Sequence, residues 1–350
     1  MSRKVAYIGV CIAALSLSAC GTPTPSASKN TLVVAGYGGS YQEAFEKSVV
    51  PEFEKSCDCK VTYIAGSSVD TIAKLKAQRA NPQIDVALID DGPQAQAVSD
   101  GLLAPLDPKT VTNLSNIDSL ARLPKDVGAG FSLNATGIAY NADWYAKNGL
   151  PAPKSLADLA HPKLKGKVVL PSITNTYGVG LLMMGAKANG GSERQPQPGF
   201  DFAHKLAANT FTFDTSADVS NYFLQGQAVA SVWGNARVQN LASQDFPVKF
   251  VYPREKAALL LATANVVNKA PHAELAQKFV NTLLSADAQE KLAAAAYAGP
   301  TAKDAHLDKA LAAKVTGPDQ VAKLQQLDWT TINQRRSAWT DQWNKQVETQ

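Results

Sequence analysis

The residues with the most chemistry to offer lie in four polar loops, each of which follows a short apolar run. Aromatic rings can stack on a solute, carboxylates can hold an ammonium group, and arginine can bind a carboxylate or phosphate with two hydrogen bonds. Hydroxyl and amide side chains add neutral hydrogen bonds. These residue types together indicate one binding site for a small polar solute. The candidate ligand contacts are Tyr37, Ser40, Asp90, Asp91, Asn175, Thr176, Tyr177, Trp233, Asn235 and Arg237.

The first two loops also allow structural interpretations. Gly36–Gly39 lacks the spacing of a dinucleotide-binding loop, and is either a tight turn or a strand end that touches a ligand. Ser40 and Glu43 have the spacing of a capping box, which would begin a helix there. One carboxylate of the pair Asp90 and Asp91 could cap the next helix, and we expect Asp90 to lie nearer the ligand.

The third and fourth loops are ambiguous in the same way. Asn175 or Thr176 could serve only as a cap for the helix that follows. Trp233 alone would be a core residue, and Arg237 could belong to a surface ion pair. Because Asn235 and Arg237 follow the same predicted strand as Trp233, we favour a binding site at this loop.

Signatures of catalysis and of metal binding are missing from the sequence. It contains neither Gly-x-Ser-x-Gly nor His-Glu-x-x-His, and its four histidines have no paired spacing. Cys57 and Cys59 could form a small disulfide, remain idle thiols or supply two metal ligands, but a metal would need further ligands. We therefore predict no metal, no cofactor and no enzyme activity. A periplasmic hydrolase or transferase that uses Asp90 and Asp91 is the rival hypothesis.

Composition limits the class of protein. A chain of 350 residues with 45% hydrophobic and 18% charged residues suits a globular protein of two lobes. Its 34 basic and 30 acidic residues give a net charge of +4, which falls to +2 without Arg3 and Lys4. That charge is too weak for a nucleic-acid partner. Beyond the N-terminal segment there is no apolar run of about 18 residues, so no bundle of membrane-spanning helices is expected.

The N-terminal segment predicts export and anchoring. Arg3 and Lys4 form a basic head, an apolar run follows, and Leu17-Ser18-Ala19 precedes Cys20. This pattern is typical of a bacterial lipoprotein signal, with an ordinary secretory signal as the alternative. We expect residues 1–19 to be the signal peptide, Cys20 to carry the lipid, and residues 20–30 to be a flexible tether. The protein would then be extracytoplasmic or periplasmic, and held at a membrane.

Apolar periodicity predicts the elements that position the loops. Strands are expected at 32–35, 60–65 and 85–89 with helices between them, which makes a largely parallel sheet covered by helices. In the middle of the chain strands again alternate with helices, and the last third is expected to be mostly helical. No change in composition divides residues 30–350, so the chain is expected to cross between two lobes more than once.

Six stretches of the sequence resemble the extracellular solute-binding proteins of ABC importers, and most of all the spermidine/putrescine-binding-protein-like family. In chain order they are LVVAGYGGSYQEAFEKSVVPEFEK, DVALIDDGPQAQAVSDGLLAPLD, GIAYNADWYAKNGLPAPKSLADL, LKGKVVLPSITNTYGVGLLM, AVASVWGNARV and DWTTINQRRSAWTDQWNKQV. The resemblance implies an α/β fold of the type II periplasmic-binding-protein class, with two lobes that are each a mixed sheet flanked by helices. It also implies a permease and an ATPase as partners, and we expect a monomer.

The same resemblance implies how the chain divides. Two crossovers are expected, near residues 134–137 and 262–266, with the ligand held in the cleft between the lobes. Residues 31–136 and 263–302 would form lobe 1, and residues 137–262 and 303–350 would form lobe 2. A transport protein with this plan closes around its ligand.

The positions that hold polyamines in that family are matched only in part. Tyr37 and Trp233 stand where those proteins have aromatic residues. Their acidic clamp after the second crossover appears here as Ala262, with Leu260 in place of a neighbouring aromatic residue, and Arg237 is an addition. A polyamine needs carboxylates at both ends, because an unpaired buried ammonium group is costly.

We therefore expect a zwitterionic, amino-acid-like solute. Its amine would face Asp90 or Asp91, its acid would face Arg237, and Tyr37, Tyr177 and Trp233 would form the walls. Polyamine binding is the first alternative. A lipoprotein that acts in interaction or assembly is the second.

Overall fold

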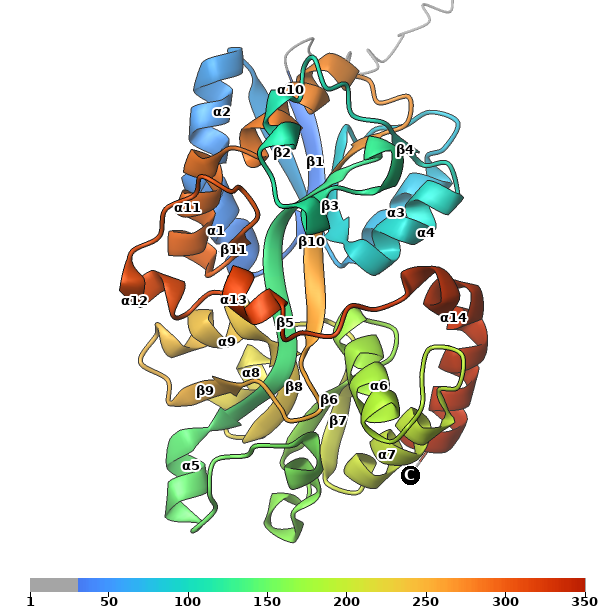
Figure 1. Cartoon of the computed structure of the whole chain (residues 1–350), viewed down its shortest axis with the longest axis vertical. Coiled ribbons are helices and arrows are strands. Elements are labelled where there is room, and N and C mark those ends of the chain that lie inside the picture. Colours follow the sequence, from blue (N-terminus) through green and yellow to red (C-terminus); the bar gives the residue numbers. More distant parts are fainter. Residues whose placement is uncertain (1–30, 350) are drawn as a thin grey trace, which may run out of the picture.

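The computed structural model describes residues 31–349, which form two lobes joined by long strands (Figure 1). The predicted signal peptide, Cys20 and the whole of the predicted tether lie outside the described residues. Two strands, β5 (Ala129–Asn141) and β10 (Ala258–Val267), run through both lobes side by side. The sheets of the lobes are therefore continuous, in the order β2-β1-β3-β10-β5-β8-β6-β7.

Lobe 1 begins with strands whose apolar residues make a buried core. The parallel strands are β1 (Thr31–Tyr37), β2 (Lys60–Gly66) and β3 (Val86–Asp90). The last of these reads VALID and is buried throughout, as expected for a strand covered on both faces. Its helices and short strand are α1 (Ser40–Ser48), α2 (Val50–Cys57), α3 (Ser68–Ala77), α4 (Asp91–Ser99) and β4 (Leu103–Ala104).

Lobe 2 is built around the C-terminal end of β5 and the N-terminal end of β10. Its parallel strands are β6 (Val168–Pro171), β7 (Thr210–Asp214) and β8 (Ala230–Gly234), while β9 (Val248–Val251) is antiparallel to β5. Its helices are α5 (Ala142–Lys147), α6 (Thr176–Ala188), α7 (Gln197–Ala207), α8 (Ser220–Leu224) and α9 (Asn235–Ala242).

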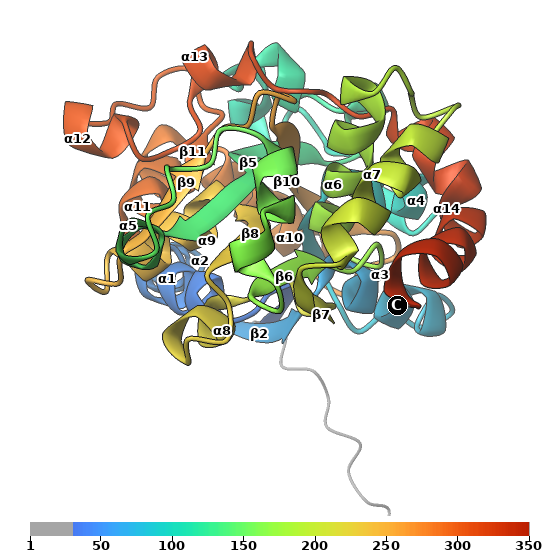
Figure 2. The same cartoon turned by 90° about the horizontal axis from the view of Figure 1, so that it is seen from below.

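The last third of the chain returns to each lobe in turn. The first part, α10 (Ala273–Leu283), α11 (Ala286–Ala296) and β11 (Gly299–Pro300), belongs to lobe 1, where β11 pairs with β5. The short helices α12 (Lys309–Ala312) and α13 (Pro318–Val321) lead to α14 (Trp329–Trp343). The tryptophans of α14 are buried in the lobe 2 core beside α7, and the same helix also contacts α4 of lobe 1 (Figure 2).

Two local predictions fare differently. The capping box at Ser40 is wrong, because Gly39 occupies the cap position with φ of 67° and Ser40 makes no cap hydrogen bond. Cys57 and Cys59 do form a disulfide, across the left-handed residue Asp58.

Within residues 31–349 no group of His, Cys, Asp and Glu could hold a metal ion, and no helix is long and apolar enough to cross a membrane.

The topology brings the four loops together. β1, β3, β6 and β8 all end, in the chain direction, at the boundary between the lobes. Ligands bind at the carboxyl ends of strands in open α/β sheets because the helices that follow begin there. Two lobes that present this edge to each other enclose the space between them.

Candidate solute-binding site between the lobes

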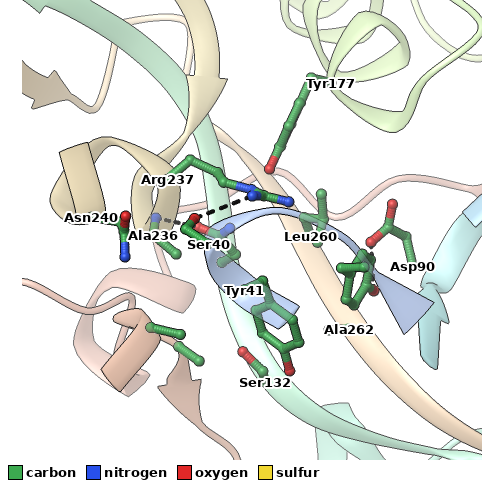
Figure 3. Close-up of a pocket in the computed structure, with 14 residues that line it drawn as sticks. Ser40, Tyr41, Asp90, Ser132, Tyr177, Ala236, Arg237, Asn240, Leu260 and Ala262 are labelled. Atoms are coloured by element: carbon green, nitrogen blue, oxygen red, sulfur yellow. Dashed lines mark hydrogen bonds between the residues drawn. The ribbon is translucent and has the colours of Figure 1, made fainter. Parts of the chain in front are cut away.

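Two adjacent cavities lie where the loops meet. The hinge-side cavity, bordered by residues of β5 and β10, has a volume of about 60 Å³, and the wide cavity has about 630 Å³. Tyr37, Asp90, Tyr177 and Arg237 line both cavities. These four predicted site residues therefore lie where the two cavities meet, with Tyr177 and Arg237 from lobe 2 facing lobe 1 (Figure 3).

Asp90 ends β3 and is the centre of a hydrogen-bond cluster. Its Oδ1 accepts from the hydroxyl of Tyr37 at 2.8 Å, and its Oδ2 accepts from the hydroxyl of Thr176 at 2.6 Å. The backbone N–H of Asp90 donates to the hydroxyl of Ser68 at 3.1 Å. Since Thr176 begins α6 of lobe 2, Asp90 connects the two lobes.

The carboxylate of Asp90 is unusual in its charge balance. The residue is only 8% exposed, and burial raises the pKa of Asp90, while hydroxyl donors and the charge of Arg237 act in the opposite direction. Among residues 31–349 no cationic side chain forms an ion pair with it. A buried carboxylate that is held only by neutral donors is costly, and an added cation would reduce that cost.

Arg237 provides the second connection between the lobes. It lies on α9, and its Nη1 is 3.0 Å from Oδ2 of Asp218 and 3.4 Å from Oγ of Ser40. Its Nη2 donates to the backbone carbonyl of Gly38 at 3.3 Å. Gly38 and Ser40 belong to lobe 1, so this guanidinium joins lobe 2 to lobe 1 at a second place in the cleft.

Three tyrosines form the walls of the cleft. Tyr37 and Tyr41 of lobe 1 meet edge to face at 5.2 Å between ring centroids, and Tyr177 lies on lobe 2. Tyr177 packs so close to Gly234 that a Cβ there would lie 2.4 Å from its hydroxyl. Burial raises the pKa of Tyr177 to about 12, and it raises the pKa values of Tyr37 and Tyr41 well above 10. All three hydroxyl groups therefore stay protonated at neutral pH and can donate hydrogen bonds. The buried hydroxyl of Tyr41 has no partner among the described residues.

Three of the residues predicted to contact the solute line neither cavity. Trp233 is 1% exposed, stacks on Phe223 and lines neither cavity, because its indole points into a core cluster of lobe 2. Asn235 also points away, and its amide donates to the carbonyl of Lys314 at 2.8 Å. Asp91 lies near Trp329 of α14 and not at either cavity.

Two further predicted residues are near the cleft in other roles. Asn175 is a helix cap, since its Oδ1 accepts from the N–H of Gly178 at 3.0 Å, although it also lines the wide cavity. Ser40 lines the hinge-side cavity and contacts Arg237. The structural interpretation of Asn175 and the binding interpretation of Ser40 are thus the ones that fit this geometry.

Sequence reasoning missed several residues of the cleft. Asp218 follows β7, a strand that was not predicted from the sequence, so Asp218 was not among the candidate residues at strand ends. Ser132 and Asn134 are polar residues near the middle of the mostly apolar strand β5, and that break in the pattern was an available signal. Tyr41 lies on α1, and it packs on the core of lobe 1 while lining the hinge-side cavity.

Comparison with known proteins decides the family. Residues 48–318 match the bacterial extracellular solute-binding proteins. The chain belongs to this family. The spermidine/putrescine-binding periplasmic protein 1 of Haemophilus influenzae is 27% identical over 307 residues, which cover 83% of each chain.

Solved structures agree with the family and the fold. The A. tumefaciens R10 protein AgtB, in complex with agropinic acid, has a TM-score of 0.77 and 26% identity over 91% of this chain and 99% of its own. An ABC transporter structure from Clostridium perfringens has a TM-score of 0.72 and 25% identity over 90% and 99% of the two chains. The predicted two-lobed fold is confirmed, as is the role of solute-binding component of an ABC importer. Such components work with a permease and an ATPase, and the family is extracellular.

Proposed function

We propose that this solute-binding protein captures a small amine whose other end is acidic or polar, an amino-acid-like zwitterion above all. The observation that carries the proposal is the Asp90 carboxylate, which is buried where the two cavities meet and, within residues 31–349, accepts hydrogen bonds from hydroxyl groups and forms no ion pair. An ammonium group would supply the missing positive charge. Across the cleft, Arg237 supplies donors for the solute's acid.

Capture would occur by closure of the lobes, without chemistry. Asp90 with Thr176 and Arg237 with Gly38 join opposite lobes, and a solute between them would add contacts that exist only in the closed state. A ligand shifts such an equilibrium by as much as its affinities for the two states differ. The importer's permease would then recognise the closed shape.

The test is calorimetric titration of protein that was unfolded and refolded to remove bound solute. We expect binding among amino acids, γ-aminobutyrate or betaines, and a loss of ten- to a hundredfold in Asp90→Asn because a hydrogen-bonded charge is lost. Asp91→Asn is the matched control, since that neighbouring carboxylate faces away from the cleft, and its affinity should be unchanged at pH 6. Equal affinity of Asp90→Asn and wild type would refute the proposal.

Polyamine binding is the second candidate, and one observation favours it. Asp218 adds a carboxylate on the lobe opposite to Asp90, and both border the wide cavity. Two carboxylates on facing lobes are what a diamine needs, although Arg237 neutralises the second one. A calorimetric response to putrescine or spermidine with none to zwitterions would select this candidate.

The sequence also supports a proposal for location. We propose that Cys20 is acylated after cleavage of residues 1–19, and that the monomer works at the membrane on the tether of residues 20–30. Cys20→Ser should then release the protein from the membrane fraction. Retention of that variant in the membrane fraction would argue against the lipid anchor.

A further inference from the structure

We propose that Asp218 determines the charge of the solute, because it holds Arg237 as a built-in counterion and so makes the site reject anions. The inference rests on the proposed function and extends it from the class of solute to the residue that sets the class. Neither the sequence pattern nor the family resemblance singled out Asp218. Its importance follows from how the loop around it is built.

The loop after β7 is fixed by its own hydrogen bonds. Asp214, at the end of β7, accepts from the hydroxyl of Ser216 and the N–H of Ala217, each at 2.9 Å. Ala217 adopts a left-handed conformation with φ of 65°, and its carbonyl accepts from the indole N–H of Trp233 at 3.1 Å. The buried tryptophan therefore acts on the site indirectly, by holding the loop that presents Asp218.

Both carboxylate oxygens of Asp218 are oriented by the protein. Oδ1 accepts from the hydroxyl of Ser220 at 2.7 Å and from its N–H at 3.2 Å, and Oδ2 lies 3.0 Å from Nη1 of Arg237. The side chains of Asp218 and Arg237 are 29% and 15% exposed. A half-buried pair on a rigid loop is preorganised, so a solute anion has to compete with a counterion already in place.

The charge of the cleft then follows from its lining. In the described part of the chain, the carboxylate and guanidinium side chains that border the two cavities are Asp70, Asp90, Asp218 and Arg237. Asp70 belongs to the capping box of α3 with Ser67, at the edge of the wide cavity. The negative charge of Asp218 neutralises the positive charge of Arg237. The carboxylate of Asp90 is then the uncompensated charge where the two cavities meet. The acid group of a zwitterion can bind Arg237 alongside Asp218 while its amine pairs with Asp90. A solute with only negative charge is repelled by Asp90 and brings no cation to compensate that carboxylate.

The first experiment uses inorganic phosphate as the probe and does not depend on the identity of the solute. Asp218→Asn keeps the side-chain shape and its acceptor for Ser220, and it frees Nη1 of Arg237. Millimolar phosphate should raise the melting temperature of Asp218→Asn but not of wild type or of the Asp218→Asn/Arg237→Gln double variant. Equal responses of wild type and Asp218→Asn would overturn the proposal.

The second experiment uses three four-carbon probes that differ in charge: putrescine, γ-aminobutyrate and succinate. In calorimetry, Asp218→Asn should change the ratio of the putrescine and γ-aminobutyrate Kd values by at least about tenfold in favour of γ-aminobutyrate, and succinate should begin to bind. A ratio that stays within about twofold of the wild-type ratio would also overturn the proposal.

The two proposals can fail separately. If wild type binds none of the amines, the proposed function fails, and the phosphate experiment still decides the role of Asp218. If circular dichroism shows that Asp218→Asn is unfolded, Arg237→Gln gives the reciprocal test. That variant leaves Asp218 uncompensated, so putrescine should bind about tenfold more tightly than to wild type, and an unchanged or weaker affinity would count against the proposal.

Discussion

Asp90 and Asp91 are neighbours in the sequence and lie in different chemical environments. The side chain of Asp90 faces hydroxyl groups in the cleft, whereas Asp91 faces the contact between α4 and α14, where its Oδ1 accepts from the N–H of Gly92 at 3.1 Å. Burial raises the pKa of Asp91 to about 7, and the nearby charge of Asp90 acts in the same direction. The carboxylate of Asp90 can therefore contact a solute, whereas the carboxyl group of Asp91 changes its protonation state near neutral pH.

The elevated pKa of Asp91 predicts a pH-dependent stability. An unfolded aspartate titrates near pH 3.9, so the folded state retains the proton up to about pH 7 and loses stability as pH rises between these values. Asp91→Asn should therefore become more stable relative to wild type by roughly 2 kcal/mol between pH 5 and pH 8. Urea unfolding at four pH values measures the difference. The exposed Asp245→Asn is the control, and a difference for Asp91→Asn that does not vary with pH would contradict the interpretation.

At this scale the sequence could predict residue types but not the direction of side chains. Asp90, Tyr37, Tyr177 and Arg237 were found because they follow strands, and all four line the cleft. Trp233 also ends a strand, but alternate strand residues point to opposite faces, and its side chain points into the core. Which of two adjacent residues faces the cleft depends on the pairing of strands that are distant in the sequence.

At the scale of elements, the loop between β1 and α1 shows why its glycines are needed. Gly39 has φ of 67°, and a Cβ on it would lie 3.1 Å from Oδ2 of Asp218 and 3.3 Å from Nη1 of Arg237. The backbone of lobe 1 therefore rests directly on the ion pair of lobe 2. The sequence indicated a glycine turn or a ligand-contacting loop, and only the closed arrangement shows that the turn contacts the facing lobe.

Gly39→Ala tests this contact. The new methyl group has to push Asp218 and Arg237 away from lobe 1, so solute should bind at least about fivefold more weakly. Gly149→Ala is a matched control, because Gly149 also has a positive φ, of 63°, with nothing within 4 Å of its Cβ position. Both variants should lose about 1 kcal/mol of folding stability from backbone strain, and only Gly39→Ala should lose affinity. Equal affinities in calorimetry would show that the contact is unimportant.

The elements that were predicted best are those with strong local signals. Apolar runs indicated β1, β2 and β3, and the cap at Asn175 indicated the start of α6. The helix expected after Ser40 is divided into α1 and α2 where Pro51 lacks a backbone N–H. β7 was not recognised, because its sequence TFTFD alternates polar and apolar residues and is not a continuous apolar run.

For the whole molecule, the hydrogen bond between Thr176 and Asp90 predicts how open the empty protein is. Thr176→Val removes a donor to a buried carboxylate across the lobes, which should reduce the closed fraction by a factor of about five or more. Small-angle scattering without solute should give a larger radius of gyration than for wild type. Thr282→Val should not differ from wild type, because the hydroxyl of Thr282 donates only to the carbonyl of Lys278 within α10 of lobe 1. Identical scattering of Thr176→Val and wild type would mean that this contact does not hold the lobes together.

The position of β10 has a consequence for the order in which the chain can acquire its structure. β10 is one of the last strands to be synthesised, and it lies between β3 and β5, pairing Ala262 with Asp90 and with Ser132. Sheets closed by contacts so distant in sequence form slowly. Until Val267 has emerged, the first lobe lacks a central strand, so the nascent chain has no complete sheet to fold around. A chain whose first lobe cannot complete its sheet before residue 267 has emerged stays unfolded for longer, which suits a member of an extracellular family.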